Sequence, residues 1–171
     1  MTQDQIIQAL HRLEEELSKE GLRGEIGIVG GAAMVLAFNA RKATKDVDAI
    51  FEPSSQIREA AARIAPRLGL PNDWINDAVK GFMPANSSPR QVILDLPHLT
   101  VWIPPTPYLL AMKAISARFD THDAQDLKTR IRFFKIKSPE QVFELIENYY
   151  PRKAIPAKTQ FFLEELFDEL G

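Results

Sequence analysis

Apolar residues recur every three or four positions near the start of the chain, which is the spacing of an amphipathic helix. The positions are Ile6, Leu10, Leu13 and Leu17. Thr2 with Gln5 three residues later is a capping-box start, and Gly21 is a typical stop. The pattern predicts a first helix that buries one face.

The next apolar stretches are short, as in strands that are buried in a sheet. Residues 26–29 predict the first strand, and Gly30 and Gly31 follow it directly. A helix is expected over residues 32–39, and a polar stretch then leads to a second expected strand over residues 46–51. The functional argument depends on this order of strand, glycine turn, helix and strand.

The middle of the chain combines one helix, a long irregular stretch and two strands. Pro53 begins an expected third helix, which has apolar residues at helical spacing. Frequent Pro, Gly, Asn and Ser make residues 69–90 irregular, with one short helix near residues 75–79. Residues 92–94 and 99–103 have the composition of strands, and two prolines end the second one.

The last third of the chain carries only helical signals. A Thr-Pro start predicts a helix over residues 106–118, and another is expected over residues 123–134. Ser138 and Pro139 begin a further helix, and an acidic terminal helix follows Pro156.

These elements predict one domain over residues 1–171 that mixes helices and strands (α/β in the broad sense) and belongs to the α+β class. The strands would lie in a core of about residues 22–104, and a helical C-terminal part would cover about residues 105–171. No apolar stretch approaches the roughly 20 residues of a membrane span, and none resembles a secretion signal. We therefore expect a cytoplasmic protein without membrane partners.

Composition narrows the chemistry more than the fold. The chain has 45% hydrophobic residues, 26% charged residues and a net charge of −2, as an ordinary globular protein does. It has no cysteine, which excludes thiol nucleophiles, disulfides and cysteine-bound zinc. Its three histidines form no metal-binding cluster, so neither a zinc hydrolase nor a Ser-His-Asp triad is expected.

Two features of residues 28–51 indicate chemistry on phosphate. Adjacent glycines between a strand and a helix let the backbone approach a ligand, and the free N–H groups of the helix start favour an anion such as a triphosphate. Asp46 and Asp48 are two apart in an expected strand, so both would project from one face, about 7 Å apart at Cα. Two carboxylates placed in this way suit one or two Mg²⁺ ions.

Neighbouring residues add polar groups, and a simpler interpretation remains open. Arg41 and Lys45 supply positive charge, and the Thr44 hydroxyl is placed to bond a phosphate or to orient an aspartate. Alternatively, the glycines form a packing turn and the aspartates are solvated charges at a strand edge. The ordered combination is more specific than the pair of aspartates alone.

The glycine turn and the acid pair resemble a signature of the nucleotidyltransferase superfamily, Gly-Gly/Ser followed by Arg-x-x-Thr-x-Asp-x-Asp. The matching segments are Val29-Gly30-Gly31-Ala32-Ala33-Met34 and Arg41-x-x-Thr44-x-Asp46-Val47-Asp48-Ala49. More narrowly, the chain is similar to small bacterial nucleotidyltransferase-like proteins related to AbiEii-type toxins. A later helix in that group carries Lys, Arg and an Asp-x-x-Asp pair, which correspond here to Lys113, Arg118, Asp123 and Asp126. Residues 72–77 also resemble a stretch of these relatives.

The resemblance implies a small mixed sheet flanked by helices, in which the glycine turn and the acid strand are neighbours. It also implies Mg²⁺ or Mn²⁺ as cofactor and an NTP as substrate. The site residues that it implies are Gly30 and Gly31 on phosphates, Asp46 and Asp48 as metal ligands, Lys113 on the nucleotide phosphates, and Asp123 near the acceptor. Arg41 and Thr44 would belong to the nucleotide site as well.

In two places the chain departs from the pattern. Many members of the superfamily carry a third carboxylate on a later strand, but residues 99–103 contain none and Asp95 precedes them in the wrong place. Gly31 stands where many active members have Ser, which removes a hydroxyl but keeps the close backbone approach.

The sequence leaves three functions open. The first is metal-dependent transfer of a nucleotidyl group from an NTP to a hydroxyl of an RNA, such as a tRNA, or of a protein, as part of a toxin–antitoxin pair. The second is a nucleotide- or partner-binding module that has lost catalysis. The third is a dinucleotide-binding oxidoreductase, because an acid follows the glycine turn, although Ala32 and Val35 replace two glycines of that fingerprint.

A basic stretch in the helical part has two interpretations. Residues 127–137 contain no acid and five basic residues, Lys128, Arg130, Arg132, Lys135 and Lys137. They would either hold RNA phosphates or balance the charges of the acidic terminal helix.

Overall fold

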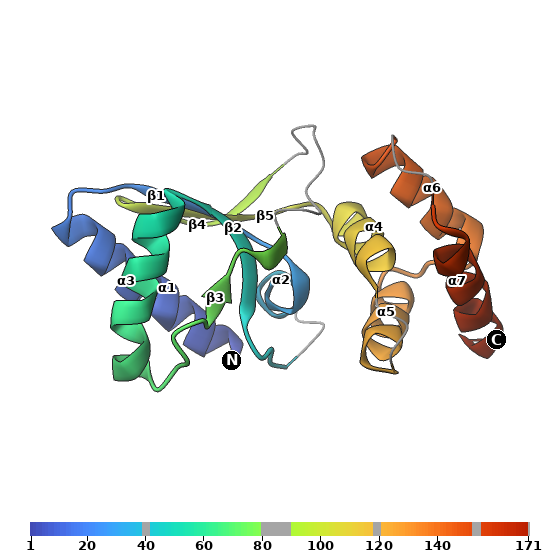
Figure 1. The fold of residues 1–171 in the computed structure, drawn as a ribbon, viewed down its shortest axis with the longest axis horizontal. Helices are drawn as coiled ribbons and strands as arrows, with labels where there is room; N and C mark the ends of the chain where they lie inside the picture. Colours follow the sequence, from blue (N-terminus) through green and yellow to red (C-terminus); the bar gives the residue numbers. More distant parts are fainter. Residues whose placement is uncertain (39–41, 80–89, 118–120, 152–154, 171) are drawn as a thin grey trace. The chain divides into compact units, whose positions relative to one another are not determined.

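The computed structural model describes residues 1–38, 42–79, 90–117, 121–151 and 155–170, with the backbone alone at residues 121–123. The chain forms two compact units, and the boundary between them lies between Pro104 and Pro105. The first unit is α+β and the second is helical (Figure 1). The fold class expected from the sequence is confirmed.

The first unit contains a mixed sheet. Its elements are α1 (Gln3–Lys19), β1 (Gly24–Ile28), α2 (Gly30–Leu36), β2 (Val47–Glu52), α3 (Ser54–Leu68), β3 (Ile75–Asn76), β4 (Gln91–Leu96) and β5 (Leu99–Ile103). The described strands are ordered β3-β2-β1-β5-β4. β1 pairs antiparallel with β2 and parallel with β5, β2 pairs parallel with β3, and β4 pairs antiparallel with β5. The glycine turn after β1 is therefore adjacent to β2, as predicted.

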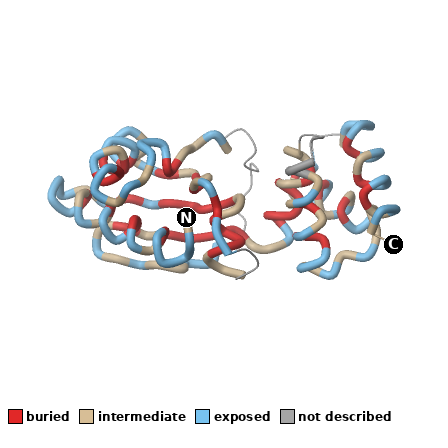
Figure 2. The backbone as a smooth tube through the Cα atoms, turned by 90° about the horizontal axis from the view of Figure 1, so that it is seen from below, coloured by how far each residue is buried: buried red, intermediate tan, exposed pale blue. Residues whose placement is uncertain are grey.

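The helices α1 and α3 cover one face of the sheet. A Cβ atom at Gly24 would lie 2.9 Å from Leu17 Cδ1 of α1 and 3.0 Å from Ile57 Cδ1 of α3. Val47, Ala49 and other apolar strand residues on this face are buried, and buried positions follow the strands in Figure 2. Strand side chains alternate between faces, so Asp48 and its register neighbours belong to the opposite face.

The first helix forms for the reason that its sequence indicates. The Thr2 hydroxyl accepts a hydrogen bond from the Gln5 backbone N–H, and the Gln5 side chain accepts one from the Thr2 backbone N–H, which completes the capping box. The apolar positions of the pattern, from Ile6 to Leu17, are fully buried. One face of α1 thus packs in the core of the first unit.

The sequence predicts a short helix near residues 75–79, and this prediction is wrong for the first half of that range. Ile75 and Asn76 form β3, because the Val47 N–H donates to the Trp74 carbonyl at 2.8 Å and β2 then continues the pairing. A 3₁₀ turn is present only at Ala78 and Val79. Pairing with a distant strand overrides the local helical signal, which has no periodicity to support it.

The second unit consists of helices that pack around aromatic residues. The helices are α4 (Thr106–Ser116), α5 (Thr121–Phe133), α6 (Pro139–Tyr149) and α7 (Ala157–Leu170) (Figure 1). The ring centroid of Tyr108 lies 5.3 Å from that of Tyr149 and 6.4 Å from that of Tyr150. Burial, together with the neighbouring Tyr150, raises the pKa of the Tyr108 hydroxyl well above its ordinary value. Within the described ranges, no helix is both long and apolar enough to cross a bilayer.

Candidate functional site

The turn between β1 and α2 brings the glycines against the acid strand. Gly30 has a φ of +62°, a conformation that favours glycine. A Cβ atom there would lie 2.6 Å from Asp48 Oδ2, so the carboxylate occupies the space that any other residue would fill. The Val29 N–H donates to the Asp48 carbonyl at 2.9 Å. Two segments about 18 residues apart in sequence thus form one site.

The two aspartates differ in their backbone setting. Asp48 is the second residue of β2, is partly buried and belongs to the sheet face away from α1 and α3. Asp46 is partly buried too, but it lies in a bend before the strand. The sequence analysis placed both in the strand, whereas β2 begins at Val47.

The loop before β2 is held by Thr44. This residue is only 8% exposed, and its hydroxyl donates to the Asp46 carbonyl at 3.2 Å. Its N–H donates to the Met1 carbonyl at 2.9 Å. Of the two roles considered for the hydroxyl, this contact favours orientation of an aspartate. Arg41 lies outside the described residues, and Lys45 is exposed.

The strands beside β2 explain why no third carboxylate was found in the expected place. β5 is separated from β2 by β1, and β3 is the neighbour of β2 on the other side. Asn76 of β3 is in register with Asp48. Sequence reasoning noticed residues 72–77 but assigned Asn76 no role, and only the pairing of the strands could have assigned one.

On β5 an aromatic residue occupies the same face of the sheet. Gly27 and Trp102 are in register, and a Cβ atom at Gly27 would lie 2.4 Å from the Trp102 ring. Trp102 Nε1 donates to Glu25 Oε1 at 2.8 Å, while the Arg90 guanidinium lies 4.4 Å from the indole centroid and pairs with Glu25. These contacts engage Glu25 of β1, and β5 itself contains no acid that could join the aspartates.

The donor set fits a magnesium ion. Over the described stretches of the chain, no three His, Cys, Asp or Glu side chains gather as metal ligands. Mg²⁺ commonly binds through one or two protein carboxylates, and substrate phosphates and water complete its coordination. Asp46 and Asp48 match this requirement. They are near a turn whose backbone N–H groups can contact an anion such as a phosphate.

The remaining predicted site residues lie in the second unit. Lys113 is a partly buried residue in the last turn of α4, and Asp123 lies in the first turn of α5. Arg118 lies outside the described residues. Within the first unit, the structure brings Gly30 against Asp48 and joins Thr44 to Asp46, and Gly31 directly follows Gly30.

The topology excludes the dinucleotide-binding alternative. That fold requires parallel strands joined by a helix at the glycine turn. Here β1 and β2, which α2 joins, run antiparallel with Ile28 opposite Ala49. The glycine turn thus has the local sequence of a dinucleotide fingerprint without its strand arrangement.

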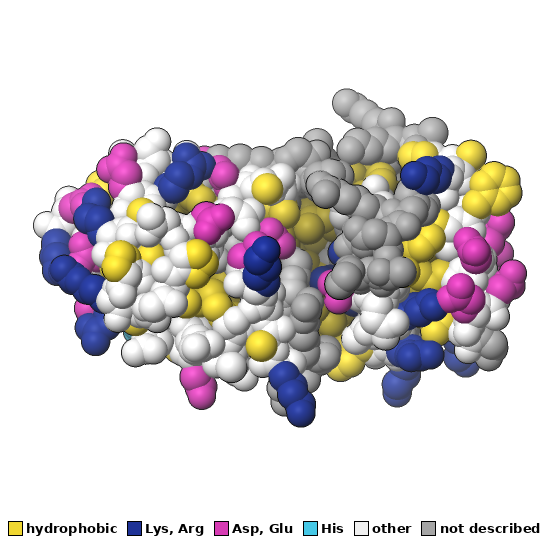
Figure 3. Space-filling model, turned by 60° about the horizontal axis from the view of Figure 1, so that its bottom comes forward, with side chains coloured by type: hydrophobic (Ala, Val, Ile, Leu, Met, Phe, Trp, Pro, Cys, Tyr) yellow, Lys and Arg dark blue, Asp and Glu magenta, His cyan; other side chains and the backbone are white. Residues whose placement is uncertain are grey.

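The basic stretch of α5 does not form a single charged row. Arg130 is 4% exposed, and Lys128 forms an ion pair with Glu169 of the acidic helix α7. On the face of the molecule that Figure 3 shows, Lys and Arg are interspersed with Asp and Glu. These contacts favour the interpretation that the stretch balances the terminal helix.

This interpretation predicts a coupling between Lys128 and Glu169. We expect Lys128→Ala and Glu169→Ala to lower the free energy of unfolding modestly, with an interaction energy of about 0.5 kcal/mol in a double-mutant cycle. Chemical denaturation of the two single variants and the double variant measures it. An additive cycle would contradict the ion pair, whereas an RNA-binding role would show as weaker RNA retention by Lys128→Ala and not by Glu169→Ala.

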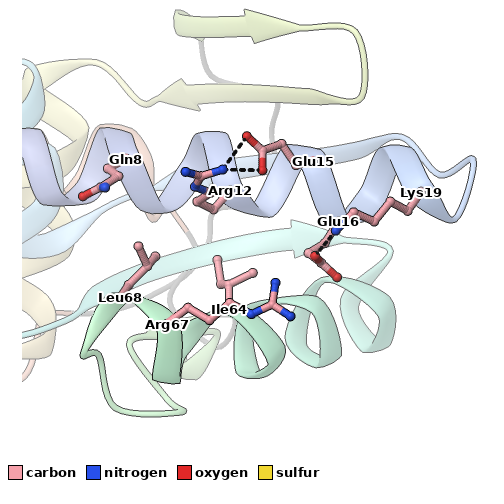
Figure 4. Close-up of a pocket in the computed structure, with 8 residues that line it drawn as sticks. All are labelled: Gln8, Arg12, Glu15, Glu16, Lys19, Ile64, Arg67 and Leu68. Atoms are coloured by element: carbon pink, nitrogen blue, oxygen red, sulfur yellow. Dashed lines mark hydrogen bonds and ion pairs between the residues drawn. The ribbon is translucent and has the colours of Figure 1, made fainter.

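A surface cavity of about 250 Å³ lies in the first unit between α1 and α3, and its lining includes none of the predicted site residues (Figure 4). Its lining residues are Gln8, Arg12, Glu15, Glu16, Lys19, Ile64, Arg67 and Leu68. Arg12 pairs with Glu15 at 2.8 Å and Lys19 with Glu16 at 2.5 Å, so charges within the lining satisfy one another. The cavity lies on the side of the sheet opposite to Asp48.

Comparison with known proteins agrees with the geometry of the glycine turn and the acid pair. No curated protein and no solved structure matches the chain. The model of a family described as "Nucleotidyltransferase of unknown function (DUF6036)" matches residues 5–149. This match spans both the glycine turn and the helix that carries Lys113, and the chain therefore belongs to the nucleotidyltransferase family DUF6036.

Proposed function

We propose that this chain transfers a nucleotidyl group from an NTP to a hydroxyl of an RNA, such as a tRNA, or of a protein. The observation that carries the proposal is the contact of the Gly30 turn with the Asp48 carboxylate. This contact supports an anion site at the backbone of the turn, beside an acid that would bind the metal, and membership of a nucleotidyltransferase family supports the reaction type.

The residues of the first unit would act on the triphosphate end of the NTP. Gly30 and Gly31 would receive phosphate oxygens at their backbone, while Asp46 and Asp48 would hold Mg²⁺ or Mn²⁺. The bound ion neutralises triphosphate oxygens and lowers the pKa of the attacking hydroxyl. Thr44 would keep Asp46 in place through its hydrogen bond.

The reaction forms one bond and breaks another. The acceptor oxygen bonds to the α-phosphorus, the bond from that phosphorus to the bridging oxygen breaks, and pyrophosphate departs with the electron pair. The hydroxyl proton passes to a base near the acceptor. From the family resemblance, we assign this neighbourhood to Asp123 and contact with the nucleotide phosphates to Lys113.

The resemblance to AbiEii-type toxins extends the proposal to a cellular role. We propose that the chain works in the cytoplasm as one member of a toxin–antitoxin pair, with a cognate toxin or antitoxin as its partner. Expression in bacteria with and without the protein encoded next to it tests this role. Growth arrest that the neighbour relieves is expected, and unaffected growth under both conditions contradicts it.

A second candidate is a nucleotide- or partner-binding module on the same fold. The observation in its favour concerns the described strands next to β2: β3 contains no acid, and Glu25, the acid of β1, lies opposite Glu52 at the end of β2 away from Asp48. Such a module would bind Mg²⁺ and an NTP without transferring anything. Measurement of binding and of transfer on the same preparation separates the two candidates.

Incubation with labelled nucleotides tests the proposed reaction. The protein is mixed with Mg²⁺, cell extract and each of the four α-labelled NTPs, and RNA is then separated from protein. We expect label from one or a few NTPs in one fraction. Binding of an NTP with no label in either fraction would favour the binding module instead.

A further inference from the structure

The strand β3 has only two residues, but the residues directly before and after it are anchored to α3 and β2. Trp74, directly before it, is fully buried, and its indole Nε1 donates to the Ala61 carbonyl of α3 at 3.1 Å. Its own carbonyl accepts the Val47 N–H. Directly after the strand, Asp77 pairs with Arg58 of α3 at 2.9 Å. The backbone is thus anchored on both sides of Ile75 and Asn76.

This anchoring positions Asn76 beside the acid pair. Asp48 and Asn76 are register partners in a parallel pair of strands, so their side chains share one face of the sheet. Neighbouring strands lie about 4.8 Å apart, a distance within which one ligand can contact both side chains. Asn76 is partly buried, and Ile75 faces the core at 3% exposure.

One end of the Asn76 amide already has a partner. Its Oδ1 accepts a hydrogen bond from the Ala78 N–H at 3.2 Å. Within the described part of the chain, Nδ2 donates to no protein group. Asn76 therefore offers N–H donors beside Asp48.

We propose that Asn76 Nδ2 donates a hydrogen bond to a phosphate oxygen of the nucleotide bound at Asp48. This inference rests on the proposed function and adds a nucleotide-binding residue to it. An N–H group cannot ligate a cation, whereas anionic oxygens accept strong hydrogen bonds. In the proposed function the triphosphate would lie near Asp48, because the ion that Asp48 would hold neutralises phosphate oxygens.

Two substitutions at Asn76 test the donor. Asn76→Ala removes it, and Asn76→Asp keeps an acceptor for the Ala78 N–H but turns a donor into a negative charge. We expect the Kd for Mg²⁺ with a non-hydrolysable α,β-methylene NTP to rise at least about tenfold in Asn76→Ala and further in Asn76→Asp. Calorimetric titration with analogues of all four bases measures it.

The control is Asn72→Asp, which adds the same charge at an exposed position of the same loop. It is expected to bind the analogue as the wild type does. Thermal unfolding of all variants checks their folding, and Asn76→Asp is expected to remain folded because it retains the acceptor. A drop in affinity of equal size in Asn72→Asp would overturn the assignment.

Binding of Mn²⁺ alone, followed by electron paramagnetic resonance, separates a phosphate donor from a metal ligand. We expect Asn76→Ala to bind Mn²⁺ with unchanged affinity. Loss of Mn²⁺ in this variant, or tighter nucleotide binding by Asn76→Asp, would make the residue a metal ligand and overturn the proposal.

Failure of the Asn76 inference is distinguishable from failure of the proposed function. If the wild type binds an analogue and Asp48→Asn weakens this binding but Asn76→Ala does not, only the Asn76 inference fails. If the wild type binds none of the four, the proposed function fails with it.

Discussion

Asp48→Asn is expected to lower nucleotidyl transfer at least about a hundredfold, because it removes a charge that, in the proposed function, would hold the metal ion beside the glycine turn. The substitution keeps the size of the side chain, so the close contact with Gly30 remains and the fold should be unaffected. Asp46→Asn is expected to act in the same direction. Incorporation of label from the preferred NTP into its acceptor measures both effects, and thermal unfolding verifies that the variants are folded.

Asp95→Asn provides the matched control. Asp95 is a carboxylate in β4 of the same sheet, where it accepts from the Thr100 hydroxyl at 3.0 Å and pairs with Arg23 at 3.5 Å. Loss of the Asp95 charge should leave the protein folded, since exposed ion pairs of this kind contribute little to stability, and should leave nucleotidyl transfer unchanged. Full transfer by both Asp46→Asn and Asp48→Asn would contradict the assignment of the acid pair.

Gly30→Ala is the second substitution with a large expected effect. The positive φ costs an L-residue about 1 kcal/mol of folding free energy, and the new Cβ would lie 2.6 Å from Asp48 Oδ2. The carboxylate must therefore move. We expect a fall of 1–3 kcal/mol, as an order of magnitude, in the free energy of unfolding and a loss of nucleotide binding. Denaturant titration and calorimetric binding of an NTP analogue measure the two effects.

Gly21→Ala separates the two causes of the effect expected for Gly30→Ala, which are the cost of a positive φ and the contact of the new Cβ with Asp48. Gly21 has a φ of +65°, but a Cβ atom there would have no other atom within 4 Å. Gly21→Ala should therefore lower the free energy of unfolding only through the backbone conformation, and it should leave nucleotide binding intact. If Gly30→Ala bound nucleotide as well as Gly21→Ala does, the contact between the glycine turn and Asp48 would have no part in the site.

Local signals in the sequence were sufficient for most of the elements. The capping box at Thr2, the Thr-Pro start of α4 and the Ser-Pro start of α6 all occur where helices begin. These signals involve residues only a few positions apart, so they are readable without knowledge of the fold. The glycine turn between β1 and α2 belongs to the same class.

Interactions between distant residues could not be predicted in this way. Ile75 and Asn76 have too short a pattern to distinguish strand from helix, and the partner that decides between them is Val47, 28 residues earlier. Residues 99–103 contain no acid, and the order of the described strands places β1 between them and β2, so β3 and not β5 adjoins Asp48. Nothing in the local sequence reveals that order.

The sequence by itself determined the α+β class and the glycine turn and named the acid pair as candidate metal ligands, because helix caps, apolar spacing and a short ordered motif are local properties. Tertiary structure alone decided that Gly30 contacts Asp48, that Trp102 and Glu25 engage each other on the neighbouring strands, and that Asn76 lies beside Asp48. These contacts depend on strand order and register. Both are set by which apolar faces the sheet can bury beneath α1 and α3, a property of the whole unit and not of any one segment.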